Sequence, residues 1–152
     1  MSDLHKIEVV FEKNGVLAVN KPAGLPTQAP WGIESVESLI RRQKFHQHFE
    51  DAIESGGTRH PGGFLGVPHR LDRAVSGVML LALTPRAARQ LSRQFERRQI
   101  QKTYVAVVES TDALPVSEEP FIWRDAIRKV SGEPRVEVVK THDSHAKPAL
   151  TK

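Results

Sequence analysis

HRLDRAVSGVMLLAL, residues 69–83, joins a cluster of charges to a continuous apolar run. In the first part, Asp72 is flanked by Arg70 and Arg73, and Ser76-Gly77 follows closely. The second part, VMLLAL, has the length and composition of a strand that is covered on both faces. The stretch therefore predicts that Asp72 lies in a loop that enters a buried strand.

Upstream of this loop the sequence predicts a β-hairpin. IEVVFEKNGVLAVN, residues 7–20, has two β-rich runs separated by Asn14-Gly15, a dipeptide that tolerates the positive φ angles of a tight turn. NKPAGLP, residues 20–26, then brings two prolines and a glycine, which end the second strand. A loop of rigid, irregular shape is expected from Asn20 onward.

Two amphipathic helices are predicted. The first covers SVESLIRRQKFHQHF, residues 35–49, with Ser35 as N-cap. The second begins at Thr84-Pro85, which fit an N-cap and a first helical residue, and includes RAARQLSRQFERR, residues 86–98. Its arginines at 86, 89, 93 and 97 gather on one side, which is read as a solvated face in preference to a phosphate-binding track.

The remaining chain adds further strands. QKTYVAVV, residues 101–108, and RVEVV, residues 135–139, are predicted as strands, and AKPALTK, residues 146–152, begins another extended segment. IWRDAIRKV, residues 122–130, is too short to assign, and SGGTRHPGG, residues 55–63, is predicted to be a mobile loop. The order of elements indicates an α+β domain with a mixed, largely antiparallel sheet flanked by helices.

Composition sets the broad class. A length of 152 residues fits a single domain, 1–152, and no apolar run approaches the roughly 20 residues of a membrane span. The chain has no cysteine, and its first residues lack the features of a secretory signal, so a cytoplasmic location is expected. The net charge of +4 permits a polyanionic partner without requiring one.

Three stretches together resemble the RluA-type RNA pseudouridine synthases. They are NKPAG (20–24), HRLDRAVSG (69–77) and QKTYVAVV (101–108), in this order and with an arginine-rich helix before the last. The resemblance runs from about Ile7 to the end of the chain. It implies a catalytic domain with a cleft that accepts a uridine from structured RNA, with Asp72 as the catalytic aspartate and Tyr104 against the target base.

The chemistry of this isomerisation fits a single carboxylate. The bond between ribose and the base nitrogen breaks and the same sugar carbon joins a base carbon, so no redox cofactor is needed and none is expected. A carboxylate can act as the nucleophile or as a base in an elimination. The uridine must also leave its stack, for which Arg70 is the hypothetical wedge and Tyr104 the stacking surface.

Other residues near these motifs are assigned supporting roles. Arg70, Tyr104, His69 and Arg73 are predicted to bind substrate. Support of the active-site loop is predicted for Asn20, Lys21, Pro22, Gly24, Leu71, Ser76 and Gly77. Each feature alone has a simpler explanation: an aspartate between arginines is usually a solvated ion pair worth roughly 0–1 kcal/mol, and a strand tyrosine is usually a half-buried sheet residue.

No metal site is predicted. His46, His48, His142 and His145 are interpreted as surface histidines, because the chain has neither cysteine nor an HExxH pattern. The expected partner is RNA, ribosomal or transfer, and neither a membrane nor a metal. The sequence leaves the oligomeric state open.

The chain also departs from the family pattern. Ala74-Val75 stand where members commonly have Asp-Thr, and the sequence ends before the Gly-Arg-x-His-Gln-Ile-Arg segment whose basic residue partners the catalytic aspartate. Two functions are therefore weighed. The preferred one is an RNA pseudouridine synthase, either a fragment of a longer enzyme or a short member, and the alternative is a noncatalytic RNA-binding protein derived from the same fold.

Overall fold

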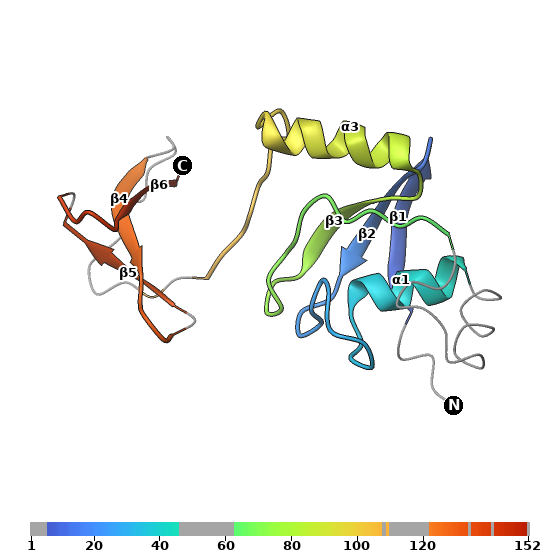
Figure 1. Ribbon diagram of the computed structural model, residues 1–152, viewed down its shortest axis with the longest axis horizontal. Coiled ribbons are helices and arrows are strands. Elements are labelled where there is room, and N and C mark those ends of the chain that lie inside the picture. The colour runs from blue at the N-terminus through green and yellow to red at the C-terminus, as the bar shows by residue number, and fades with distance from the viewer. Residues whose placement is uncertain are drawn as a thin grey trace. The chain divides into compact units, whose positions relative to one another are not determined.

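The computed structural model describes residues 6–45, 63–107, 109, 122–133, 135–140 and 142–151 (Figure 1). The chain divides into two compact units, Met1–Tyr104 and Val105–Lys152. The predicted loop at 55–63 lies outside the described residues except for Gly63. Within the described ranges, no helix is both long and apolar enough to cross a bilayer.

A three-stranded antiparallel sheet forms the centre of the first unit. Strands β1 (Glu8–Lys13), β2 (Val16–Lys21) and β3 (Gly77–Ala82) lie in the order β1-β2-β3. The hairpin between β1 and β2 is confirmed, with Asn14 and Gly15 at φ angles of 51° and 77°. These left-handed conformations are the ones that the Asn-Gly pair tolerates.

Helices cover both faces of this sheet. Helix α1 (Val36–Lys44) packs Val36, Leu39 and Ile40 into one core with alternate residues of β2 and β3, namely Leu17, Val19, Met79 and Leu81. Helix α3 (Pro85–Glu96) packs Ala87 and Leu91 against Ala82, with Val16 and Leu80 beside them. Because side chains alternate along a strand, the two helices lie on opposite faces.

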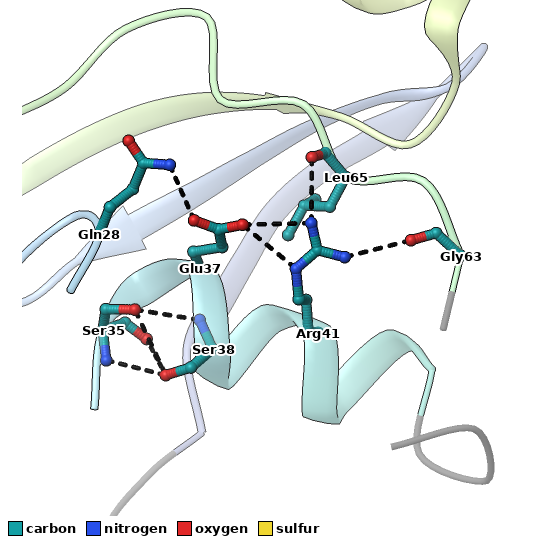
Figure 2. Close-up of polar contacts among 7 residues, drawn as sticks. All are labelled: Gln28, Ser35, Glu37, Ser38, Arg41, Gly63 and Leu65. Atoms are coloured by element: carbon teal, nitrogen blue, oxygen red, sulfur yellow. Dashed lines mark hydrogen bonds and ion pairs between the residues drawn. The ribbon is translucent and has the colours of Figure 1, made fainter. Parts of the chain in front are cut away.

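The predicted starts of both helices are confirmed. The Ser35 side chain accepts a hydrogen bond from the Ser38 amide, and the Ser38 hydroxyl accepts one from the Ser35 amide (Figure 2). Thr84 caps α3 by accepting from the Ala87 amide at 3.2 Å, and Pro85 is the first helical residue. Such caps satisfy backbone N–H groups that would otherwise have no partner in the first turn.

The second unit is a smaller antiparallel sheet. Its strands β4 (Trp123–Lys129), β5 (Val136–Val139) and β6 (Lys147–Thr151) lie in the order β5-β4-β6. The strand expected at 135–139 and the extended segment near the end of the chain are confirmed. The segment that the sequence left unassigned, 122–130, supplies the central strand.

The strand predicted at 101–108 is wrong for its described part. Residues 101–107 form no strand and are exposed, and the Val107 side chain is fully accessible. A high β-propensity does not make a strand without a neighbour to pair with. The α+β class itself is confirmed, although every pairing among the described strands is antiparallel, so no mixed sheet is seen there. In strand β3, Met79, Leu81 and Ala82 are buried, Gly77 and Leu80 are partly buried, and Val78 is exposed.

Candidate active site

The loop that carries Asp72 precedes β3 and runs along its free edge. Gly66 and Ala82 exchange two backbone hydrogen bonds of 2.7 and 2.9 Å, and the loop then turns before β3 begins at Gly77. The Val75 amide donates to the Asp72 carbonyl at 3.0 Å, which closes this turn. The Asp72 side chain is exposed. The carboxylate is therefore presented to solvent by a loop whose two ends are tied to the sheet.

Lys21 lies beneath this loop at the end of β2, and it is completely buried. Its ammonium group donates to the carbonyl oxygens of Val75 at 2.6 Å, Pro22 at 3.0 Å and Arg73 at 3.3 Å. Burial lowers the pKa of Lys21, and the negative charge of Asp72 raises it in part. The ammonium group thus ties the exit of β2 to the backbone that follows Asp72.

The two loops that the sequence singled out lie side by side. The Gly24 amide donates to the Arg73 carbonyl at 2.7 Å, and Nε of Arg73 donates to the Gly24 carbonyl at 2.8 Å. Gly24 has a φ of 85°, a conformation that side chains disfavour. Direct hydrogen bonds therefore join the 20–24 and 69–77 stretches.

Thr27 is a site residue that the sequence did not reveal. Its buried hydroxyl donates to the Leu71 carbonyl at 2.8 Å and accepts from the Leu71 amide at 3.3 Å. Leu71 also packs its partly buried side chain against the α1 core. Both the backbone and the side chain of the residue before Asp72 are consequently fixed, yet no motif in the sequence marks Thr27.

His69 holds the start of the loop to β3 and to α3. Its Nε2 accepts a hydrogen bond from the Leu80 amide at 2.8 Å, which requires that nitrogen to be unprotonated. Its ring stacks on Phe95, with centroids 4.4 Å apart and planes 25° apart. Burial and the nearby Lys102 lower the pKa of His69. The helix predicted at 86–98 included Phe95, but its contact with His69 was not foreseen.

A hydrogen-bond network on α1 holds the segment that leads to the loop (Figure 2). The Arg41 guanidinium donates to the carbonyls of Gly63 and Leu65 and pairs with Glu37 at 3.1 Å. The Gln28 amide donates to the other Glu37 oxygen at 2.8 Å. Residues 63–65 are thereby anchored on the helix before the chain reaches His69.

The residues with the proposed contacts to RNA are exposed. Arg70 lies at the surface, and Tyr104 is 62% exposed. No ring contact or hydrogen bond joins Tyr104 to another residue in the described part of the chain, Asp72 included. The structure therefore brings the 69–77 and 20–24 stretches together, but it does not bring Tyr104 into contact with Asp72.

The other predicted support residues have varied surroundings. The Asn20 amide donates to Glu8 across the β1–β2 pair at 2.9 Å, and this contact is exposed. Gly77 has a φ of 135° at the start of β3, and Ser76 is exposed. Pro22 contributes its carbonyl to Lys21.

The histidines considered as metal ligands give no cluster. His46 and His48 lie outside the described residues, whereas His142 and His145 are exposed. Nδ1 of His145 lies 4.0 Å from a carboxylate oxygen of Asp143. In the ranges that the structure describes, no three His, Cys, Asp or Glu side chains gather as metal ligands would.

Comparison with known proteins places these features in one family. The profile described as RNA pseudouridylate synthase matches residues 15–152. The chain is 39% identical over 110 residues to tRNA pseudouridine synthase C of Pectobacterium carotovorum subsp. carotovorum, covering 71% of this chain and 25% of the relative. It is 33% identical over 105 residues to the dual-specificity RNA pseudouridine synthase RluA of Haemophilus influenzae, covering 67% of this chain and 40% of that protein.

Solved structures agree on the fold. Human RNA pseudouridylate synthase domain containing 1 matches with a TM-score of 0.59 and 18% identity over 99% of this chain and 52% of its own. Human RNA pseudouridylate synthase domain containing 4 matches with a TM-score of 0.54 and 18% identity over 94% and 51%. The chain spans between a quarter and two fifths of the length of the two bacterial relatives. The profile, the relatives and the shared fold show that the chain belongs to the RluA-type RNA pseudouridine synthase family.

Proposed function

We propose that this chain carries the catalytic aspartate of an RNA pseudouridine synthase and that Asp72 acts on a uridine turned out of its stack. The observation that carries the proposal is the placement of Asp72. Its carboxylate is exposed, while the backbone around it is held by the buried Lys21 ammonium, by Gly24 and by Thr27. An accessible group on a fixed backbone is what a reaction at a sugar carbon requires.

The proposed reaction is an isomerisation within one nucleotide. The bond from the ribose C1′ to the base N1 breaks, the base turns, and C1′ joins C5 of the same base. The proton on C5 leaves to solvent and N1 gains one, so atoms and electrons balance. The Asp72 carboxylate serves as the nucleophile toward C1′ or as the base in an elimination, and both roles need its ionised form.

Arg70 and Tyr104 are proposed to handle the flipped uridine. Both side chains are exposed, so each is accessible to RNA. Arg70 would fill the gap that the uridine leaves, and Tyr104 would stack on the base. Arg70→Ala should therefore weaken RNA binding or turnover. Unchanged behaviour in both assays would remove Arg70 from the proposal.

Transfer RNA is the proposed substrate class, because several relatives are named tRNA pseudouridine synthase C. The Haemophilus influenzae relative is named a dual-specificity enzyme, so ribosomal RNA is the substrate against which tRNA should be compared. The proposed location is the cytoplasm, where a bacterial-type enzyme meets tRNA.

Tritium release from RNA labelled at C5 of uridine tests the activity. Wild-type protein should release tritium from tRNA faster than from ribosomal RNA, and Asp72→Asn should abolish release while leaving RNA binding intact. Binding without release by the wild type would instead favour a noncatalytic RNA-binding protein. Release by Asp72→Asn at the wild-type rate would exclude Asp72 as the catalytic group.

A further inference from the structure

One side of α3 and its C-cap carries four exposed arginines, which we call the arginine ridge. They are Arg86, Arg89 and Arg93 in the helix and Arg97 at the C-cap. Residues at these spacings fall within an arc of about 80° on a helix with 100° per residue. In the described part of the chain, none of the four makes an ion pair or a side-chain hydrogen bond. The helix contains one acid, Glu96, so the ridge is a strip of positive charge.

The basic residues of helix α1, in contrast to those of the ridge, form ion pairs with acidic side chains. Arg41 pairs with Glu37, Arg42 pairs with Glu34, and Lys44 pairs with Glu12. All three basic residues of α1 thus have acidic partners. The contrast separates the ridge from an ordinary charged face, which was the interpretation that the sequence favoured.

Helix stability does not explain the ridge either. The first turn of α3 holds Arg86 and no acid, although the positive end of the helix dipole favours acids there. Arg89 and Arg93, and likewise Arg93 and Arg97, are four residues apart, a spacing at which like charges repel. Arg93 and Arg97 suit the negative C-terminal end of the helix dipole, but the repulsion along the ridge is relieved only when an anion binds to it.

The opposite side of α3 fixes the ridge relative to the candidate active site. Ala87 and Leu91 pack on the sheet, and Phe95 stacks on His69 at the start of the loop that carries Asp72. The ridge faces away from these contacts, on the outer side of the helix. Anions bound there are consequently held at a set position near the site but not at Asp72 itself.

The length of the ridge suits a nucleic acid backbone. Eleven residues separate Arg86 from Arg97, which corresponds to about 16 Å along the helix axis. A nucleic acid strand in a duplex presents a phosphate about every 3.4 Å along its axis, so several phosphates fit beside the ridge. Guanidinium groups suit phosphates, because they can donate two hydrogen bonds in parallel.

We propose that the arginine ridge of α3 binds the phosphate backbone of the substrate RNA at nucleotides that flank the target uridine. The proposal deepens the RNA-modifying function above and rests on it for the identity of the polyanion. Because the ridge faces away from Asp72, its contacts would set affinity and orientation for RNA beyond the reacting nucleotide.

Salt dependence of RNA binding tests the ridge directly. The ridge variant R86Q/R89Q/R93Q/R97Q is compared with a control, K6Q/K13Q/R42Q/K44Q, which also removes four positive charges. Lys6 precedes β1, Lys13 ends it, and Arg42 and Lys44 lie on α1. Binding of a full-length tRNA transcript is measured between 0.05 and 0.3 M salt, after circular dichroism shows that both variants fold. The slope of log K against log salt should fall in magnitude by about 3 in the ridge variant and by less than about 1 in the control.

At about 0.1 M salt the ridge variant should bind the transcript at least tenfold more weakly than the control does. Equal slopes and affinities for the two variants would overturn the proposal, because net charge alone would then explain binding. Stronger ridge-dependent binding to anionic phospholipid vesicles than to tRNA would overturn it as well. The tritium assay tests the isomerase proposal separately. A wild type that releases no tritium would contradict that proposal, and it could still show ridge-dependent RNA binding.

Discussion

The Nε2 atom of His69 accepts a hydrogen bond from the Leu80 backbone amide at 2.8 Å. This contact pins the start of the Asp72 loop to the edge of β3, two residues from the place where Gly66 pairs with Ala82. An acceptor nitrogen must carry a lone pair, so the contact exists only while His69 is neutral. Loop position and the protonation of one histidine are therefore linked.

The first prediction concerns the pH dependence of stability. The pKa of His69 is lowered in the folded protein from the ordinary value of 6.5. The unfolded chain then binds more protons between the folded pKa and about 6.5, so the His69 contribution to stability rises with pH in that window and is constant above it. Urea unfolding of the wild type and His69→Gln from pH 5 to 8 measures this contribution as a difference.

The difference between the two unfolding free energies should shrink as the pH falls below 6.5. Glutamine keeps an oxygen that can accept from the Leu80 amide but has no proton to gain, so it serves as the control for the pH effect. A difference that stays constant over the whole range would show that the protonation of His69 is not coupled to folding.

The second prediction is that Lys21→Met loosens the loop more than it destabilises the fold. Methionine fills the same buried space and has no charge that must be taken out of water, so the exchange should cost less than about 2 kcal/mol. The carbonyls of Arg73 and Val75 lose their shared donor. Hydrogen exchange at the Gly24 and Val75 amides should accelerate, whereas amides within β2 and β3 should keep their protection.

A destabilisation well above 2 kcal/mol with uniform loss of protection would contradict this expectation. It would assign Lys21 to the general stability of the unit instead of to the Asp72 loop. Lys21→Met should also lower the rate of tritium release from RNA if the loop positions Asp72.

Local signals in the sequence were enough to predict much of the first unit. Asn14-Gly15, Ser35 and Thr84-Pro85 determine a turn and two helix starts through interactions within a few residues, and all three are confirmed. The strand at 101–108 failed because a strand depends on a partner, which propensity cannot supply. Features set by neighbouring residues could be predicted from the sequence, whereas the pairing of a strand with a distant partner could not.

The candidate site likewise combines residues that local motifs identify with contacts between residues far apart in the sequence. The motifs identified Asp72 and its neighbours, but Lys21 meets Val75 across 54 positions and Thr27 meets Leu71 across 44. Such contacts depend on the register of β2 against β3, which no local pattern specifies. The roles of Asp72, Arg70 and Tyr104 toward RNA stay predictions until turnover is measured.

The third prediction tests Thr27. Thr27→Val keeps the shape of the side chain but removes the hydroxyl that serves both backbone groups of Leu71. Leaving this part-buried amide and carbonyl without their partner should cost about 1–3 kcal/mol of unfolding free energy. Thr27→Ser retains the hydroxyl and is the matched control. A larger loss in Thr27→Ser than in Thr27→Val would show that the methyl group, and not the hydrogen bonds, is what matters.

The last prediction compares two adjacent arginines of α1. Arg41 and its partner Glu37 have side chains only 10% and 16% exposed, and Arg41 also donates to two backbone carbonyls (Figure 2). Arg42 and Glu34 are 42% and 43% exposed. Removing one partner of a buried pair typically costs about 3 kcal/mol or more, whereas an exposed pair contributes about 0–1 kcal/mol.

Urea unfolding should therefore show a loss of about 3 kcal/mol for Arg41→Met and less than about 1 kcal/mol for Arg42→Met. Both changes remove one positive charge from the same helix, so similar losses would contradict the role given to burial. The Arg41 variant should also speed hydrogen exchange at the Gly66 amide, because the segment it anchors leads directly to the β3 edge.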